Sequence, residues 1–198
     1  MPRIRADDYD AKQRAILDNA AALFAAVGYP NAKMLEIAKV CGATKSMLYH
    51  YFATKDDLLF ALLSEHLERL IADADDVLDA AGPAEGRFTR FVELYVRKSA
   101  ESRQRHVSAM NDAKFLPAPL QARIHDLEAQ VVARVAALLR PLKPGLGDDL
   151  YKPYALLLLG MLNWTDYWYD PAGRIPPDDL RDRISGLFLA GFLAAAPG

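Results

Sequence analysis

The sequence predicts an all-helical (all-α) protein of about nine helices. Apolar residues recur at spacings of three and four along most of the 198-residue chain, which is the pattern of amphipathic helices. No stretch shows the strict alternation of β-branched residues that marks a strand, and clusters of glycine and proline interrupt the helical pattern. Three short helices are expected first, followed by a bundle of longer ones.

The first three helices follow from this spacing. Residues 10–27 form one amphipathic helix, and Gly28 ends it in the position that favours glycine. We expect Asn31 to cap a second helix that ends near residue 41, and Thr44 to cap a third that ends near Phe52.

A longer fourth helix and the remaining bundle come next. Thr54 and Asp57 have the spacing of a capping box and predict a helix over residues 55–80. The stretch AAGPAEG at 80–86 then breaks the chain. Further helical patterns cover residues 87–102, 104–114, 119–139, 149–169 and 178–195.

Composition limits the class of protein. Apolar residues make up 52% and charged residues 25% of the chain, as in ordinary globular proteins. Cys41 is the only cysteine, so we expect a buried structural thiol and a reducing cytoplasm. The N-terminal residues lack the apolar core of a signal peptide, and the most apolar run, residues 154–164, falls short of the ~20 residues of a membrane span. A soluble cytoplasmic protein without a membrane partner is expected.

Residues 34–52 match a helix-turn-helix, because two short helices flank a turn that contains Gly42. In the second helix Leu48 and Phe52 are four apart and are expected to point inward. Inward positions in the first helix are Ile37, Ala38 and Val40. The residues left facing outward, toward a major groove, are Lys45, Ser46, Met47, Tyr49 and His50.

These outward residues have the chemistry of DNA contacts. Tyr49 can donate to a phosphate, Lys45 can reach a phosphate or a guanine edge, and Met47 suits a thymine methyl group. Lys55 adds charge in the first turn of the next helix, where free N–H groups favour an anion. The net charge of the chain is −2, yet residues 30–55 carry four lysines and one glutamate.

The stretch GYPNAKMLEIAKVCGATKSMLYHYFATKDDLL, residues 28–59, resembles the N-terminal domain of tetracycline-repressor (TetR) family regulators. The resemblance is strong over about residues 10–60 and architectural beyond. Ala32 and Lys33 stand where the family usually has Thr or Ser, so Lys33 is the candidate substitute for a phosphate contact. The matching positions are Gly28, Tyr29, Ile37, Ala38, Gly42, Thr44, Lys45, Leu48, Tyr49, His50, Tyr51, Phe52 and Lys55.

The resemblance implies a ligand-responsive transcriptional regulator. Residues 1–54 would form the DNA-binding domain with 55–80 as connecting helix, and residues 81–198 would bind an effector and dimerise. It further implies a homodimeric repressor, paired through the last two helices and released from a near-palindromic double-stranded operator by a small hydrophobic effector. The small residues in LFLAGFLAAA would let helices of two protomers approach closely; an ordinary intramolecular core helix is the other interpretation.

Candidate effector contacts are polar or aromatic residues on otherwise apolar helices: Tyr95, Arg103, His106, Asn111 and the run NWTDYWY at 163–169, above all Asn163, Trp164, Tyr167 and Trp168. Alternatively, the aromatic residues among them anchor the core or the dimer interface. The C-terminal region is similar to regulators of fatty-acid, sterol or other acyl-CoA catabolism, so an acyl-CoA is one expected effector class beside drug-like and aromatic molecules. Its phosphates would need basic donors, for which the candidates are Arg103, Arg105, Lys114 and Arg123.

Other classes find less support in the sequence. It has no phosphate-binding loop, nucleophile motif or metal-ligand spacing, so we expect no catalysis, no cofactor and no metal. A helical lipid or small-molecule carrier, or an interaction module without DNA function, is the alternative. Binding to random duplex at two salt concentrations separates the two, because only phosphate contacts release counterions.

Overall fold

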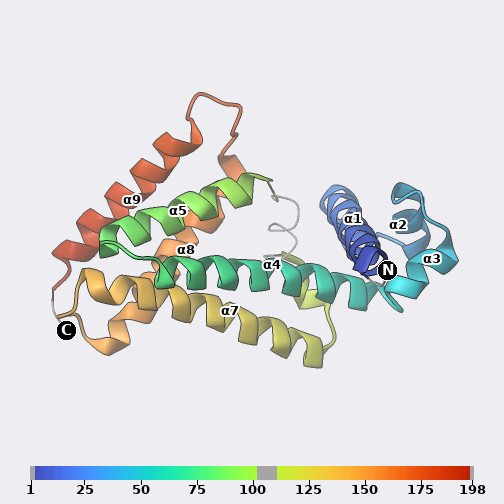
Figure 1. Cartoon of the computed structure of the whole chain (residues 1–198), viewed down its shortest axis with the longest axis horizontal. Helices are drawn as coiled ribbons and strands as arrows, with labels where there is room; N and C mark the ends of the chain where they lie inside the picture. Colours follow the sequence, from blue (N-terminus) through green and yellow to red (C-terminus); the bar gives the residue numbers. More distant parts are fainter. Residues whose placement is uncertain (1–2, 102–110, 197–198) are drawn as a thin grey trace. The chain divides into compact units, whose positions relative to one another are not determined.

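The computed structural model describes residues 3–101 and 111–196 (Figure 1). Within these ranges the regular structure is helical, which confirms the predicted fold class. The α-helices are α1 (Arg3–Val27), α2 (Met34–Val40), α3 (Lys45–Tyr51), α4 (Lys55–Asp79), α5 (Ala84–Glu101), α7 (Ala118–Leu139), α8 (Tyr151–Trp168) and α9 (Pro177–Ala194). Short 3-10 helices cover Ala113–Phe115, Arg140–Leu142 and Asp148–Leu150.

Most helix boundaries lie close to those expected from the sequence. The first helix begins at Arg3 rather than near residue 10, because the intervening residues include neither Gly nor Pro to stop it. Of the helix expected over 104–114, residues 104–110 lie outside the described ranges. Residues 111–112 are helical, and the 3-10 helix follows them.

The chain forms two compact units, and their division falls within α4 and within α7. One unit comprises residues 1–66 with 104–125, and the other comprises residues 67–103 with 126–198. The expected boundaries at residues 54 and 80 remain predictions. We call the first the DNA-binding unit and the second the effector unit, for the roles expected above.

The DNA-binding unit is held by a small apolar core. The stripe on α1 buries Ile16, Ala20 and Phe24, and α2 contributes Ile37. Val27, expected on the same stripe, is exposed, because α1 ends there and Gly28 turns the chain away with φ of 79°.

The effector unit is built around α5, which packs mainly against α9 and also against α8 (Figure 1). Phe88 of α5 stacks on Phe188 of α9 with 5.6 Å between ring centroids, and Phe192 continues the stack at the same spacing. The ammonium of Lys143 donates to the carbonyl of Leu193 at 2.7 Å. A cation thus closes the carboxyl end of α9, where unsatisfied carbonyls favour positive charge.

Candidate functional site

Helix α3 is fixed by a cap at its start and by two apolar side chains beneath it. The backbone N–H of Met47 donates to Thr44 Oγ1 at 3.1 Å, as the N-cap prediction requires. Leu48 and Phe52 are buried, which confirms them as anchors. These two side chains therefore fix which face of α3 is turned toward the core.

The opposite face of α3 is open to solvent. The exposed residues are Thr44, Lys45, Ser46, Met47, Tyr49 and His50. Lys45 Nζ lies 5.7 Å from the centre of the Tyr49 ring, so an ammonium and a phenol share one surface. Tyr49 is 42% exposed. Together they can donate hydrogen bonds to the oxygens of a phosphate.

Tyr9 of α1 supports the carboxyl end of α3, a contact that the spacing of residues did not predict. Its ring stacks on Tyr51 at 4.5 Å between centroids and meets His50 edge-on at 6.4 Å. Tyr51 is therefore half-buried and belongs to the support rather than to the presented face.

The start of α2 differs from expectation. Asn31 does not cap this helix; its side-chain amide donates to the carbonyl of Val27 at 2.8 Å and closes the end of α1. The N-cap position falls to Lys33, whose backbone N–H donates to the Glu36 carboxylate at 3.1 Å. The Lys33 side chain is exposed, which leaves it available to a phosphate.

Two residues at the end of α2 are more exposed than expected. Val40 was expected to face inward but is exposed, because it lies about 200° around the helix from buried Ala38. Cys41 is half-buried rather than buried. Burial raises the pKa of its thiol, so the thiolate form is disfavoured.

Lys55 has an internal role besides the phosphate contact expected of it. Its ammonium donates to the carbonyls of Tyr29 at 2.8 Å and Ala32 at 2.9 Å and lies 4.3 Å from the Tyr29 ring centre. It thereby ties the loop between α1 and α2 to the start of α4. The phosphate contact of Lys55 stays a prediction.

Tyr29 is the centre of this junction. Its hydroxyl donates to the Asp56 carboxylate, and its buried ring stacks on Phe115 at 5.8 Å. Burial, followed by the hydrogen bond to Asp56, raises the pKa of the phenol. The loop before the helix-turn-helix is thus joined to the segment that precedes α7.

In the effector unit the structure brings together two of the predicted contacts. The Tyr95 hydroxyl of α5 donates to Asn163 Oδ1 of α8, and Tyr95 is buried. Burial raises the pKa of Tyr95, and the charge of Asp166 adds to the effect. Asp166, which belongs to the predicted run 163–169, is buried as well.

The three predicted aromatic contacts are not buried with this pair. The aromatic residues Trp164, Tyr167 and Trp168 are exposed, which rules out the core as their place in a single chain, and Trp164 stacks on Tyr167 at 4.8 Å. Asn111 belongs to the DNA-binding unit. Arg103, Arg105 and His106 lie outside the described residues.

Two of the proposed phosphate donors for a coenzyme A lie against aromatic rings of the DNA-binding unit. Arg123 lies 4.4 Å from the centre of the Phe60 ring, and Lys114 lies 5.2 Å from that of Phe115. These contacts explain the cations without a ligand.

Helices α8 and α9 each carry an exposed stripe of apolar and small residues. On α8 the stripe comprises Leu156, Leu157, Gly160, Trp164 and Trp168, and on α9 it comprises Gly186, Leu187, Ala190, Gly191 and Ala194. Leu187 is 72% exposed and Trp164 is 62% exposed. An exposed stripe that carries large apolar side chains is typical of an interaction site.

The described part of the chain holds no group of three or more His, Cys, Asp or Glu side chains placed to bind a metal ion. Among its helices, none has a long enough apolar stretch to span a bilayer.

The fold and the presented face of α3 define a helix-turn-helix DNA-binding protein, and comparison with known proteins agrees. Residues 16–62 match the model of bacterial regulatory proteins of the tetR family. Residues 81–192 match the tetracyclin repressor-like C-terminal domain. A TetR-family transcriptional regulator from Bordetella parapertussis 12822 is 32% identical, with a TM-score of 0.84, and the match covers 94% of this chain and 98% of that one.

The chain belongs to the TetR family of transcriptional regulators. The predicted class, a ligand-responsive DNA-binding regulator, is thereby confirmed.

Curated relatives include two repressors of Mycobacterium tuberculosis. The HTH-type transcriptional repressor Rv1474c is 38% identical over 74 residues, which are 37% of this chain and 40% of that protein. The HTH-type transcriptional repressor KstR2 is 23% identical over 94% of this chain and 95% of its own length.

The regulator AibR has been solved in complex with isovaleryl coenzyme A and operator DNA. Its TM-score is 0.76 at 23% identity, over 89% of this chain and 97% of that one. At this identity the likeness shows a common fold.

Proposed function

We propose that the protein is a homodimeric repressor that leaves a near-palindromic operator when a small hydrophobic effector binds. The observation that carries the proposal is α3, whose exposed face presents Lys45, Met47 and Tyr49 while Leu48 fixes it from beneath. Such a protein acts where bacterial operators lie, in the cytoplasm, and the proposal gives it no catalytic step.

The proposed DNA contacts divide into two kinds. Lys33, Lys45, Tyr49 and Lys55 contact phosphates with their side chains and so position the protein, and Lys45 is also within reach of a guanine edge. Met47 reads the major groove through a thymine methyl group. Thr44, Ser46 and His50 complete the presented surface.

The proposed dimer forms through the exposed stripes of α8 and α9. Small residues on α9 let two helices approach closely. Burial of the exposed Leu187 side chain in the interface would stabilise the dimer. Two copies of each helix then make a four-helix bundle across a two-fold axis. Trp164 and Trp168 lie on this surface, so we reassign them from effector contacts to the dimer interface.

The proposed effector contacts are Tyr95 and Asn163, with Asp166 beside them. A phenol, an amide and a carboxylate within an apolar unit can orient a ligand whose remainder is apolar. The fold shared with AibR favours an acyl-CoA among the possible effector classes. Release requires that the effector bind more tightly to the conformation that fits the operator poorly.

Selection of bound duplexes from a random pool tests the DNA-binding proposal. We expect the wild type to recover a near-palindromic sequence, and Met47→Ala to recover one with changed preference at the positions that Met47 contacts. Leu35→Ala serves as control, because Leu35 is exposed on α2 outside the presented face of α3. A pool without any enriched sequence would contradict the proposal.

Variants of the buried pair test the effector site. Asn163→Leu keeps the size of the side chain but removes the acceptor for Tyr95. We expect it to bind the selected operator as the wild type does and to need a higher effector concentration for release. Unchanged release by an effector found in a ligand screen would show that Asn163 does not contact it.

A further inference from the structure

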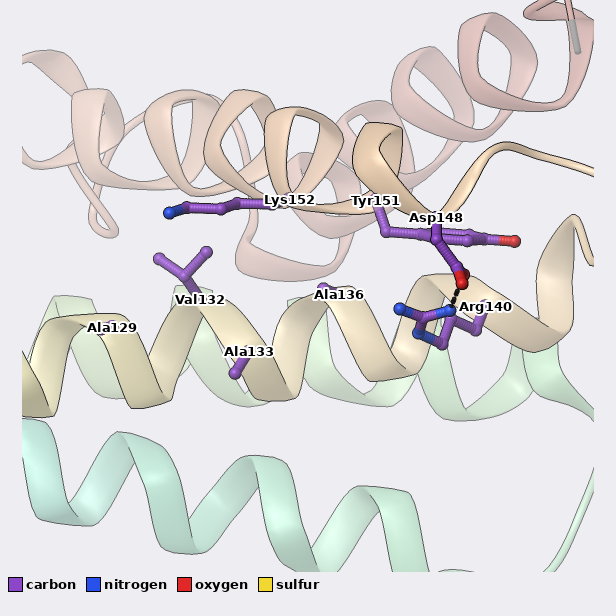
Figure 2. A pocket seen from close by; sticks show the side chains of 8 residues that line it. All are labelled: Ala129, Val132, Ala133, Ala136, Arg140, Asp148, Tyr151 and Lys152. Atoms are coloured by element: carbon purple, nitrogen blue, oxygen red, sulfur yellow. Dashed lines mark hydrogen bonds and ion pairs between the residues drawn. The ribbon is translucent and has the colours of Figure 1, made fainter. Parts of the chain in front are cut away.

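A groove in the effector unit lies between the second half of α7 and the start of α8 (Figure 2). Its volume is about 420 Å³, within the range of small-molecule sites. The lining residues are Ala129, Val132, Ala133, Ala136, Arg140, Asp148, Tyr151 and Lys152. The groove exists because alanines recur at spacings of four and three on one face of α7, opposite the first turn of α8.

The two ends of the groove differ in charge. At one end Arg140 is paired with Asp148, and its guanidinium lies 4.6 Å from the centre of the Tyr151 ring. Toward the other end Lys152 extends above Val132 (Figure 2). Lys152 is exposed, and among the residues that the structure describes its ammonium pairs with no carboxylate. Of the two described cations that line the groove, Lys152 is therefore the one whose charge a ligand can neutralise.

The middle of the groove is apolar. Methyl groups of Ala133 and Ala136 form its floor, and the Tyr151 ring forms part of its wall. The Tyr151 hydroxyl donates to the carbonyl of Lys143 at 2.7 Å, so its hydrogen bond is already made inside the protein. From Val132 to Arg140 the floor extends about 12 Å along α7.

We propose that this groove binds an amphipathic monoanion of the medium-chain carboxylate type. The carboxylate pairs with Lys152, where a charge-assisted hydrogen bond replaces contact with water. The chain lies on the alanine floor and ends before the Arg140–Asp148 pair. This site is separate from Tyr95 and Asn163, because Asn163 is eleven residues beyond Lys152, about 16 Å along α8.

Calorimetric titration of the 198-residue chain with octanoate tests the proposal. We expect saturable binding at one site per chain, and much weaker binding of acetate, which lacks the chain, and of octanol, which lacks the charge. Lys152→Gln should weaken octanoate binding by about tenfold or more. Lys39→Gln is the matched control, since Lys39 is an exposed lysine of the DNA-binding unit, and it should leave the affinity unchanged.

A second variant tests the floor without touching the charge. Ala133→Phe fills the groove from an exposed position on α7, and it should abolish octanoate binding while the protein stays dimeric in light scattering. Asn163→Leu should leave octanoate binding unchanged. Three results would each overturn the proposal: no octanoate binding by the wild type, equal affinity in Lys152→Gln and wild type, or loss of the dimer in Ala133→Phe, which would make the groove a contact between protomers.

Discussion

At the scale of single residues, the presented face of α3 carries a charged side chain and a neutral hydrogen-bond donor side by side. Lys45 carries a full charge, whereas Tyr49 is a neutral donor of similar exposure beside it. Binding to DNA responds to these two kinds of contact differently, because only a cation displaces counterions from the phosphates. Substituting each in turn therefore distinguishes their roles.

Lys45→Ala and Tyr49→Ala are both expected to weaken binding to every duplex. For Lys45→Ala the slope of log affinity against log salt concentration should become shallower by about 0.9, whereas Tyr49→Ala should leave the slope unchanged. Fluorescence anisotropy at four salt concentrations measures both. Full operator affinity in Tyr49→Ala would contradict the assignment of this face.

Tyr29 gives the DNA-binding unit a predictable response to alkaline pH. Burial and the hydrogen bond to Asp56 raise the pKa of its phenol in the folded protein above the ordinary value, which is about 10. The stabilisation is therefore complete below pH of about 10 and is lost as pH rises from there toward the folded pKa.

Tyr29→Phe should accordingly be less stable than wild type near neutral pH, because Asp56 loses a donor, by about 1 kcal/mol. The difference should shrink as pH rises beyond about 10. Urea unfolding monitored by circular dichroism at several pH values gives the free energies of unfolding. A constant difference across this range would show that the Tyr29 phenol does not titrate differently in the two states.

At the scale of elements, α4 begins with a reciprocal capping box. The Thr54 N–H donates to Asp57 Oδ2 and the Asp57 N–H donates to Thr54 Oγ1, each at 3.0 Å. This cap satisfies two of the N–H groups that a helix start leaves unpaired. It also holds Lys55 and Asp56 in the first turn, where they meet the Tyr29 loop.

Asp57→Ala should lower the free energy of unfolding by about 1 kcal/mol. Asp76→Ala is the matched control, because Asp76 is an exposed carboxylate on the same helix, and it should change stability little. Equal effects of the two substitutions in urea unfolding would mean that the cap contributes nothing beyond its charge.

The stripes of α8 and α9 make a second prediction at this scale. Leu187→Glu places a charge in the proposed dimer interface and should weaken dimerisation roughly a hundredfold. Leu35→Glu, at an equally apolar exposed position on α2, should leave the dimer intact. Sedimentation equilibrium measures both, and a dimeric Leu187→Glu protein would exclude the interface.

At the scale of the whole molecule, the proposed function joins two units through one chain. Helices α4 and α7 each contribute to both units, so the chain passes from one unit to the other within a helix. If two such chains pair, their α3 helices meet successive major-groove faces of one duplex, spaced about 34–36 Å or more apart depending on DNA distortion.

Operator geometry then becomes a test of the dimer. An insertion of about five base pairs between the half-sites turns one of them to the opposite side of the duplex. Affinity should fall to that of random DNA, and an insertion of about ten base pairs in another position, outside the half-sites, should leave it unchanged. Gel-shift titration measures these affinities. Equal binding to all three duplexes would mean that each protomer binds alone.

Local sequence is enough to predict most helices, the caps at Thr44 and Thr54 and the two faces of α3. These features depend on neighbours within a few residues, as with Thr44 and Met47 or Leu48 and Phe52, and local spacing is enough to predict them. The errors at Asn31 and Val40 occurred at helix ends, where a polar group has several possible backbone partners and a side chain lies beside a turn.

Contacts between residues far apart in the chain could not be predicted from local spacing. The Tyr9–Tyr51 stack, the Lys55 contacts with the Tyr29 loop and the Tyr95–Asn163 hydrogen bond join segments far apart in the chain. The structure also shows Trp164 exposed, whereas the aromatic run around it in the sequence fitted a pocket, a core or an interface. Helical periodicity says which side of a helix is apolar, but the neighbour that covers that side is chosen by packing of the whole chain.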